Sequence, residues 1–328
     1  MCTSCRCGAA GAPASQEGCG AGIREAFDLV HADAPERLLI ANPDGLRLPR
    51  GSSGETNWHQ QGIQRTGQGQ FVVSGSAPEA GYLYFTDAAL RVVNVVAPRG
   101  TTQAANHRQL NHLGGLQVAG DLLAVGYERY QNGAAGTSRI LFYDIADIRR
   151  PIALEHLTIV RDHAGQTGGA VGLIALPDCW LVMVANWDAV RVDFYLSHAR
   201  DLHGRATRFD AEPRWSWSRA SHGLADGSVD DVWGWYQNVN LFSEPGRPAN
   251  PQDLWFVGLY EHRADLYHLV VGRGEPQVRK VGSRTFEGEL GFSQAAGVYY
   301  DPLSHAMQVY AAEAHLHDGR ESRAERWA

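Results

Sequence analysis

Short apolar runs that alternate with polar residues, each bounded by Gly, Asn or Asp, fill most of this chain. Between residues 111 and 147, one run closes at Ala119, the pair Gly120-Asp121 suits a tight hairpin turn, and 122–125 is almost continuously apolar. Residues 140–143 predict a third strand and residues 152–160 a fourth. Four antiparallel strands in about 50 residues make a unit the size of one propeller blade.

This unit recurs along the chain. Its openings fall near residues 62, 114, 169, 238 and 297, so that the spacing runs from 52 to 69 residues. A repeat of this length with four strands per copy indicates a β-propeller. The fold class that we predict is all-β, a five-bladed β-propeller with four antiparallel strands per blade. A six-bladed ring or a β-sandwich with insertions is the alternative.

The two ends of the chain predict how such a ring closes. The last copy ends at Ala328 after two or three strands, whereas residues 26–30 and 37–40 precede the first copy without a blade of their own. We therefore expect the N-terminal segment to complete the last blade, which removes an exposed strand edge. Residues 23–328 then form one propeller domain, with an insertion at about 205–235.

Composition narrows the class of partner. The 328 residues carry a formal net charge of −7, which argues against nucleic acid as a partner. No apolar run is long enough for a membrane span, and no secretory signal is visible at the N-terminus. We expect a cytoplasmic protein that binds a small polar molecule or a sugar, with the cofactor unknown.

Residues 1–22 are predicted to be a flexible tail rich in Cys and Gly. Cys2, Cys5, Cys7 and Cys19 are crowded among Gly, Ala, Ser and Pro. Such dense thiolates suit a zinc or iron–sulfur clip, but the second paired Cys-x2-Cys spacing is missing. The tail interpretation is favoured because the segment has little apolar content.

Polar side chains stand where each innermost strand begins. In a propeller these starts converge on one face, where the central channel opens as a funnel. The residues at these positions that we predict to bind a ligand are Trp58, His59, Gln61, Asn111, Tyr236, Gln237, Asn238 and Gln294. His112 opens the second inner strand and is a candidate proton shuttle near neutral pH.

A second set of polar residues follows the second strand of the copies, at the same face. It supplies Glu128, Glu261 and Glu313 as candidate catalytic acids or bases, together with Trp187 and Asp188 as ligand contacts. The alternative is that these acids pair with Arg129, Arg263 or backbone donors. As a set, the groups resemble a ligand pocket. A divalent metal ion held by His59, His112 and Glu128 is a further alternative.

The insertion at about 205–235 has two interpretations. Its Trp-Ser-Trp and Trp-Gly-Trp segments, with several acids and His222, would suit a lid over the funnel. Alternatively, residues 214–219 form a fourth strand, and the tryptophans pack between blades.

In overall plan, residues 27–328 resemble the five-bladed β-propellers, a fold shared by furanosidase-type glycoside hydrolases, some lectins and unrelated enzymes. The glycosidases of this fold place carboxylates on the inner strands, where this sequence has Gln, Asn and His. The function predicted is an enzyme that acts on a polar or carbohydrate-like substrate by general acid/base chemistry, with His112, Glu128, Glu261 and Glu313 as catalytic residues. The alternatives are a non-catalytic ligand-binding propeller and a protein-interaction scaffold.

Overall fold

The computed structural model describes thirteen stretches of the chain: residues 22–42, 44–46, 59–77, 80–98, 110–129, 137–163, 166–187, 189, 191–218, 233, 235–272, 274–315 and 320–328. The four cysteines of the predicted tail, Trp58 and Asp188 lie outside these stretches, so the predictions made for them stay predictions. Within them the protein is all-β, apart from one short helix and one 3-10 turn, as the alternation predicted.

Most strands belong to consecutive groups of four, each a meander of antiparallel neighbours. The first group contains β2 (His59–Arg65), β3 (Phe71–Ala77), β4 (Ala80–Thr86) and β5 (Val92–Val96). The third contains β11 (Ala170–Ala175), β12 (Trp180–Ala185), β13 (Arg191–Leu196) and β14 (Trp215–Ser218), and the fourth β15 (Asn238–Ser243), β16 (Leu254–Tyr260), β17 (Arg263–Val270) and β18 (Gln277–Thr285).

The second group departs from this regularity at its outer edge. It contains β6 (His112–Ala119), β7 (Leu122–Glu128) and β8 (Ser138–Asp144). The single fourth strand predicted at 152–160 is instead two pieces that both pair with β8, β9 (Ile152–Ala153) and β10 (Ile159–Arg161), separated by the 3-10 turn η2 (Glu155–Leu157). Leu157 in that turn is buried, so the apolar residue that suggested a strand serves the core from a turn.

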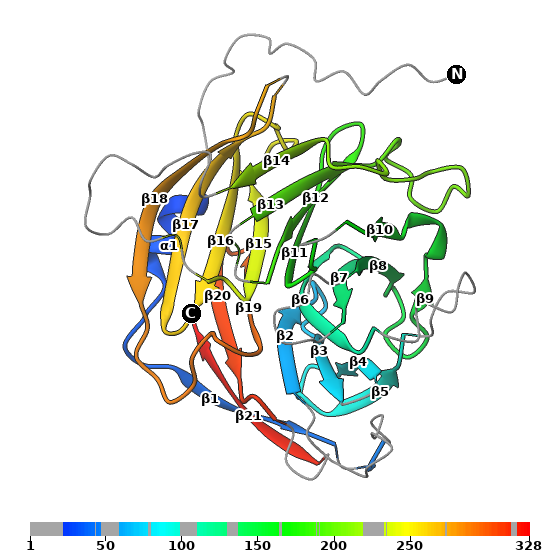
Figure 1. Cartoon of the computed structure of the whole chain (residues 1–328). Coiled ribbons are helices and arrows are strands. Elements are labelled where there is room, and N and C mark those ends of the chain that lie inside the picture. The colour runs from blue at the N-terminus through cyan, green and yellow to red at the C-terminus, as the bar shows by residue number, and fades with distance from the viewer. Residues whose placement is uncertain are drawn as a thin grey trace.

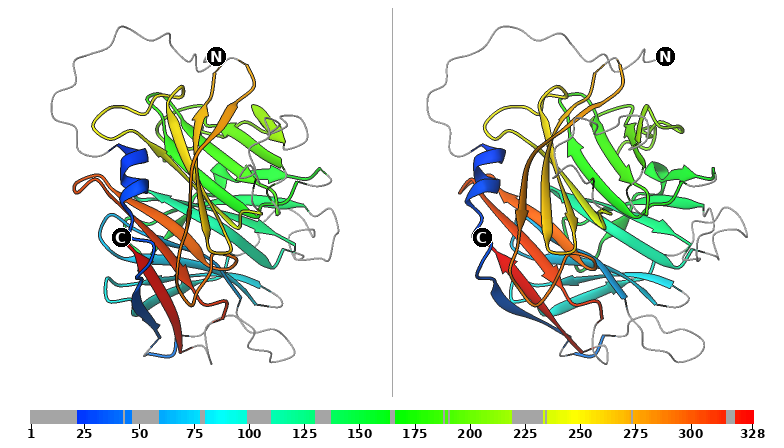
Figure 2. Two further views of the ribbon diagram at one scale, coloured as in Figure 1. Left: turned by 90° about the vertical axis from the view of Figure 1, so that its left-hand side faces the viewer. Right: turned by 60° about the vertical axis from the view of Figure 1, so that its left-hand side comes forward.

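The last group combines the two ends of the chain. It contains β19 (Ala296–Asp301), β20 (Ala306–Ala312) and β21 (Glu321–Trp327), and β1 (Glu36–Ala41) pairs antiparallel with β21 over six residues. The expected pairing of the N-terminal segment therefore holds for β1. Residues 26–30 do not form the expected strand, because α1 (Ile23–Leu29) is helical. Its buried Ile23, Ala26 and Phe27 pack beside β20. Figure 2 shows α1 close to the C-terminus, where His31 N donates to Ala328 O at 3.2 Å.

The first strands of the groups meet in the middle of the molecule (Figure 1). One parallel bridge, Ala296 with Gly62, joins β19 to β2 and links the first and last groups into one eight-stranded sheet. Glycine permits this close approach: a Cβ on Gly114 would lie 2.3 Å from the carbonyl oxygen of Gly169. The Gly-Gly pairs of the sequence therefore serve strand contact.

Among the described residues, five clusters of buried apolar side chains lie between these groups of strands. Each cluster joins two groups that are neighbours in the chain, except one that joins the last group to the first. In that cluster Phe71 of β3 meets Tyr310 of β20 edge-on, with ring centroids 5.3 Å apart. The hydrophobic core is thus divided among the interfaces between sheets.

The described part of the insertion at 205–235 agrees with the interpretation as a fourth strand whose neighbouring tryptophans pack between strand groups. β14 is the outer strand of the third group, and Trp217 and Trp233 are buried with ring centroids 4.3 Å apart. Residues 219–232 and 234 are outside the described part of the chain. Trp235 is exposed and lies near Tyr260.

Among the described residues, no helix is both long enough and apolar enough to span a membrane.

Candidate functional site

Three imidazole rings gather where the inner strands β2 and β6 begin. His59 opens β2, His112 opens β6, and His315 follows β20 and bridges to His59. The ring centroid of His59 lies 6.3 Å from that of His112 and 5.7 Å from that of His315. With Trp187, these three residues form what we call the imidazole cluster.

His59 is held in one neutral tautomer by two glutamines. Gln61 Nε2 lies 2.7 Å from His59 Nδ1, and Gln294 Oε1 makes a close contact with His59 Nε2. An amide nitrogen donates and an amide oxygen accepts, so the ring proton belongs on Nε2. Burial of the ring, with smaller contributions from the charges of His112 and His315, lowers the pKa of His59 to about 4, although the Gln294 contact opposes the shift. His59 therefore carries no charge at neutral pH.

His112 is backed by a buried carboxylate. Its Nδ1 lies 3.3 Å from Oε1 of Glu128, a side chain that is only 1% exposed. The other oxygen of Glu128 accepts the backbone N–H of Gly168 at 2.6 Å. Because β6 and β7 place His112 and Glu128 directly opposite each other in the ladder, the pairing follows from strand register.

One face of His112 is covered by an aromatic ring. The indole of Trp187 stacks on it with ring centroids 5.7 Å apart and planes 1° apart. The backbone N–H of Trp187 donates to Thr167 Oγ1 at 2.7 Å. Since the Trp187 side chain is 38% exposed, it forms a surface-accessible edge of the imidazole cluster.

The amide residues that we predicted as ligand contacts divide into two kinds. Gln61 and Gln294 contact His59, whereas Asn238 is fully buried and donates to Gln61 O at 3.0 Å and Gln294 O at 3.2 Å. Asn238 thus braces inner strands. Gln237 is half-buried, and its N–H donates to Leu259 O. Asn111 is half-buried and donates its N–H to Glu128 O.

Two of the remaining predicted residues are engaged elsewhere, and a third is exposed. The phenol of Tyr236 is 1% exposed and donates to Asp265 at 2.5 Å, so its ring offers no free face to a ligand. The carboxylate of Glu313 accepts from Arg323, at 2.5 Å to Nε. Glu261 is exposed in the turn between β16 and β17, in a left-handed backbone conformation with φ of 50°. Glu313 thus pairs with an arginine, though with Arg323 and not with Arg129 or Arg263. Glu128 accepts a backbone donor, as the alternative expected, and also lies beside an imidazole.

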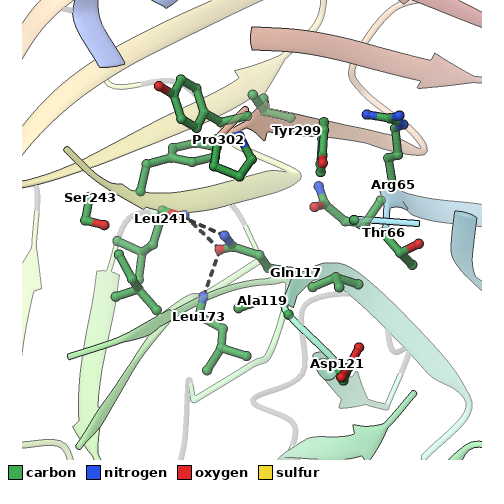
Figure 3. A pocket seen from close by; sticks show the side chains of 18 of the residues that line it. Arg65, Thr66, Gln117, Ala119, Asp121, Leu173, Leu241, Ser243, Tyr299 and Pro302 are labelled. Atoms are coloured by element: carbon green, nitrogen blue, oxygen red, sulfur yellow. Dashed lines mark hydrogen bonds between the residues drawn. The ribbon is translucent and has the colours of Figure 1, made fainter. Parts of the chain in front are cut away.

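The middle of the molecule is occupied by amides that the sequence did not single out. Gln117 of β6 donates to Leu241 O and accepts from Leu173 N and Leu241 N, each at 2.8 Å (Figure 3). Asn240 of β15 accepts from Val298 N at 2.9 Å. A polar residue in the interior of an inner strand was the sequence signal that could have identified these amides. These side chains fill the space that we expected to be a channel.

A cavity of about 500 Å³ lies at the opposite ends of the same inner strands (Figure 3). Its walls come from the last residues of β2, β6, β11, β15 and β19 and from the turns that follow them. We call it the strand-end pocket. The prediction from strand starts did not include it.

No group of three or more His, Cys, Asp or Glu side chains in the described stretches is arranged to hold a metal ion.

No protein-family model and no curated protein matches the sequence. Among solved structures, a Bombyx mori β-fructofuranosidase of glycoside hydrolase family 32 is 13% identical, with a TM-score of 0.43; the match covers 83% of this chain and 62% of that enzyme. The endo-arabinase of Bacteroides thetaiotaomicron is 9% identical, with a TM-score of 0.41, and covers 86% of this chain and 97% of its own. The catalytic domain of a Coprinopsis cinerea family 62 α-L-arabinofuranosidase is 9% identical, with a TM-score of 0.45, and covers 91% of this chain and 96% of its own. Similarity this distant assigns no function, because one fold hosts many activities.

Proposed function

We propose that this protein is an enzyme that acts on a polar, carbohydrate-like small molecule at the imidazole cluster, with His112 as general acid or base. The observation that carries the proposal is the buried pair of His112 and Glu128, 3.3 Å apart, beside the partly exposed ring of Trp187.

The chemistry follows from the pairing. A carboxylate beside Nδ1 favours the tautomer with its proton on that nitrogen, which leaves Nε2 as the proton acceptor. Glu128 is itself fixed by the Gly168 N–H, so it acts as a positioning residue for His112. Such a positioned base contributes roughly 10²- to 10⁴-fold to a rate.

The other groups suit substrate binding better than proton transfer. Both ring nitrogens of His59 are engaged by Gln61 and Gln294, so His59 supplies shape and polarity to the cluster. The indole of Trp187 offers the kind of apolar face on which a sugar ring stacks. Few charges and many amide and imidazole groups favour a neutral, hydroxyl-rich substrate.

The proposal places this site on a closed ring of five four-stranded blades. The five apolar clusters between strand groups, including the one between the last group and the first, support the ring. The pairing of β1 with β21 supplies the fourth strand of the last blade. The strand starts that carry His59 and His112 then share one face.

The first prediction tests the proposed acid/base pair. The purified protein is screened against 4-nitrophenyl pyranosides and furanosides and neutral oligosaccharides, by product release and by melting-temperature shift. With an accepted substrate, His112→Ala and Glu128→Gln should each lower kcat at least about 100-fold while the variants remain folded. His203→Ala is the matched control, since His203 is exposed and lies beside Asp144 at the far end of β8.

Three outcomes would distinguish the proposed enzyme from the alternatives. Binding without turnover favours the non-catalytic ligand-binding alternative. If His112→Ala and Glu128→Gln reduce stability but leave activity per folded molecule unchanged, the pair only braces the fold. A screen without any binding or turnover contradicts a carbohydrate-like substrate.

A further inference from the structure

The strand-end pocket is physically separate from the imidazole cluster. Its floor includes Gln117, whose amide is bonded to both β11 and β15. Asn240 fills the neighbouring position and joins β15 to β19. These bonded amides lie between the two ends of the inner strands, so a ligand in the pocket would not contact His59 or His112.

Gln64 presents a buried hydrogen-bond donor at the wall of this pocket. The residue is only 2% exposed, yet its Nε2 has no hydrogen-bond partner among the described residues. Buried amide nitrogens are almost always bonded. This nitrogen packs beside Gly297 of β19 and is closed to water, so it reaches a ligand acceptor when the Gln64 side chain turns toward the cavity.

Arg65, the next residue, places a cation at the same wall. Its guanidinium carbon lies 4.5 Å from the centroid of the Tyr299 ring, so the planar group is held against that ring. No carboxylate in the described part of the chain is within salt-bridge distance of Arg65. The guanidinium N–H groups at its edge are therefore available to an anion.

Nearby charged groups are already engaged or lie at the rim. Arg247 pairs with Asp253 at 2.5 Å, and Glu244 accepts the backbone N–H of Ile23. Asp301 accepts from Leu303 N and from the hydroxyl of Ser304, each at 2.9 Å. Asp121 is exposed in the turn after β6. Arg65 thus makes no salt bridge within 4 Å to a described carboxylate, although its charge contributes, after the hydrogen bonds from Leu303 and Ser304, to the lowered pKa of Asp301.

The rest of the lining is largely apolar. Val118, Leu173, Leu241, Phe242 and Pro302 contribute to the walls, and Figure 3 shows Leu173 and Leu241 beside Gln117. A cavity of about 500 Å³ with apolar walls and a few polar groups is typical of sites for small organic molecules.

We propose that the strand-end pocket is a second ligand site that binds a small organic carboxylate, with Arg65 holding the carboxylate oxygens, Gln64 turning into the cavity to donate a further hydrogen bond, and the apolar walls holding the body. The site is independent of the function proposed for the imidazole cluster.

The second prediction tests this site by calorimetry and ligand-observed NMR, with benzoate, phenylacetate and hexanoate as probes and their neutral amides as matched controls. At least one carboxylate should bind saturably, and at least tenfold more tightly than its amide. Arg65→Met, which keeps an aliphatic stem over Tyr299, should weaken that binding at least tenfold. Gln64→Leu should weaken it several-fold.

Two controls separate the pocket from the rest of the molecule. Arg247→Met removes a rim cation that is already paired and should leave carboxylate affinity within about twofold. His112→Ala should leave it unchanged, because the pocket does not reach that residue. Equal affinity for carboxylate and amide, an Arg65→Met variant that binds like wild type, or no carboxylate with a Kd below about 10 mM would each overturn the proposal.

Discussion

His59 shows how a single side chain can be defined by its neighbours. In isolation its imidazole would titrate near neutral pH, but here burial lowers its pKa to about 4 and two glutamines fix its tautomer. His112, on the neighbouring inner strand, has a carboxylate partner instead. Two histidines at equivalent strand starts therefore have different partners, amides for His59 and a carboxylate for His112.

The third prediction concerns the effect of His59 on stability. Because the folded pKa of about 4 lies below the unfolded value of 6.5, the unfolded chain binds more protons between these pH values. Stability is fully present above about pH 6.5 and is lost as pH falls towards 4. His59→Asn should remove about 2 kcal/mol of the fall in unfolding free energy between pH 7 and pH 4.5, measured by urea denaturation.

The exposed His198 provides the matched control for that measurement, since its side chain is 57% exposed. His198→Asn should leave the pH dependence as it is in the wild type. Parallel pH curves for the wild type and His59→Asn would show that the folded pKa of His59 is not depressed.

At the scale of elements, polar residues tie strands together in two ways. Buried amides join inner strands to one another, as Gln117 joins β6 to β11 and β15. Buried acids join third strands to outer ones: Asp193 of β13 accepts from Ser216, and Asp265 of β17 accepts from Ser283, each at 2.6 Å. Each of these acids stands two residues after an arginine that pairs with it, Arg191 or Arg263. Buried polar contacts therefore recur from one strand group to another, as the apolar pattern does.

The fourth prediction concerns Gln117. Replacing it by Leu removes three hydrogen bonds and leaves buried N–H and C=O groups on two neighbouring strands without partners. Each such group costs about 1–3 kcal/mol, so Gln117→Leu should lower the unfolding free energy by at least about 3 kcal/mol in urea denaturation. Gln277→Leu on the exposed strand β18 is the control and should change it by less than about 0.5 kcal/mol. A loss for Gln117→Leu as small as that of the control would show that the central amides do not hold the inner strands together.

At the scale of the whole molecule, the N-terminal segment and the C-terminal strands form one unit. β1 pairs with β21 along its whole length, and α1 places Phe27 in the same apolar cluster as Trp327. The stability of the last strand group therefore depends on residues from both ends of the sequence.

The fifth prediction compares two truncations by melting temperature. Removing residues 1–21 should change Tm by no more than about 2 °C, because that segment has little apolar content. Removing residues 1–42 should unfold the protein, because it also deletes β1 and the buried Ile23, Phe27 and Ile40. Burial of each such side chain contributes about 1.5–3 kcal/mol, and the total is comparable to the stability of a whole domain. A large drop in Tm for the short truncation would show that the cysteine-rich segment has a structural role.

Sequence pattern alone was sufficient for most of the strands and for the pairing of residues 36–41 with the C-terminal strand. The apolar runs at 122–125 and 140–143 indicate strands buried on both faces, and that information is local. For the same reason it failed at 152–160, where Leu157 reaches the core from a 3-10 turn, and at 26–30, where Phe27 does so from a helix. An apolar residue needs burial, and more than one local geometry provides it.

The sequence by itself determined that polar groups stand at the starts of the inner strands, including His59 and His112. Only the tertiary structure decided what each does. It brought Gln294 to His59 across 235 residues of chain, buried Asn238 and Tyr236 as braces, and left Glu261 exposed. It also placed Gln64 and Arg65 at a pocket opposite the predicted face. The reason is physical: strand pattern fixes which side of a sheet a residue faces, whereas hydrogen-bond partners and pKa depend on which sheets pack together.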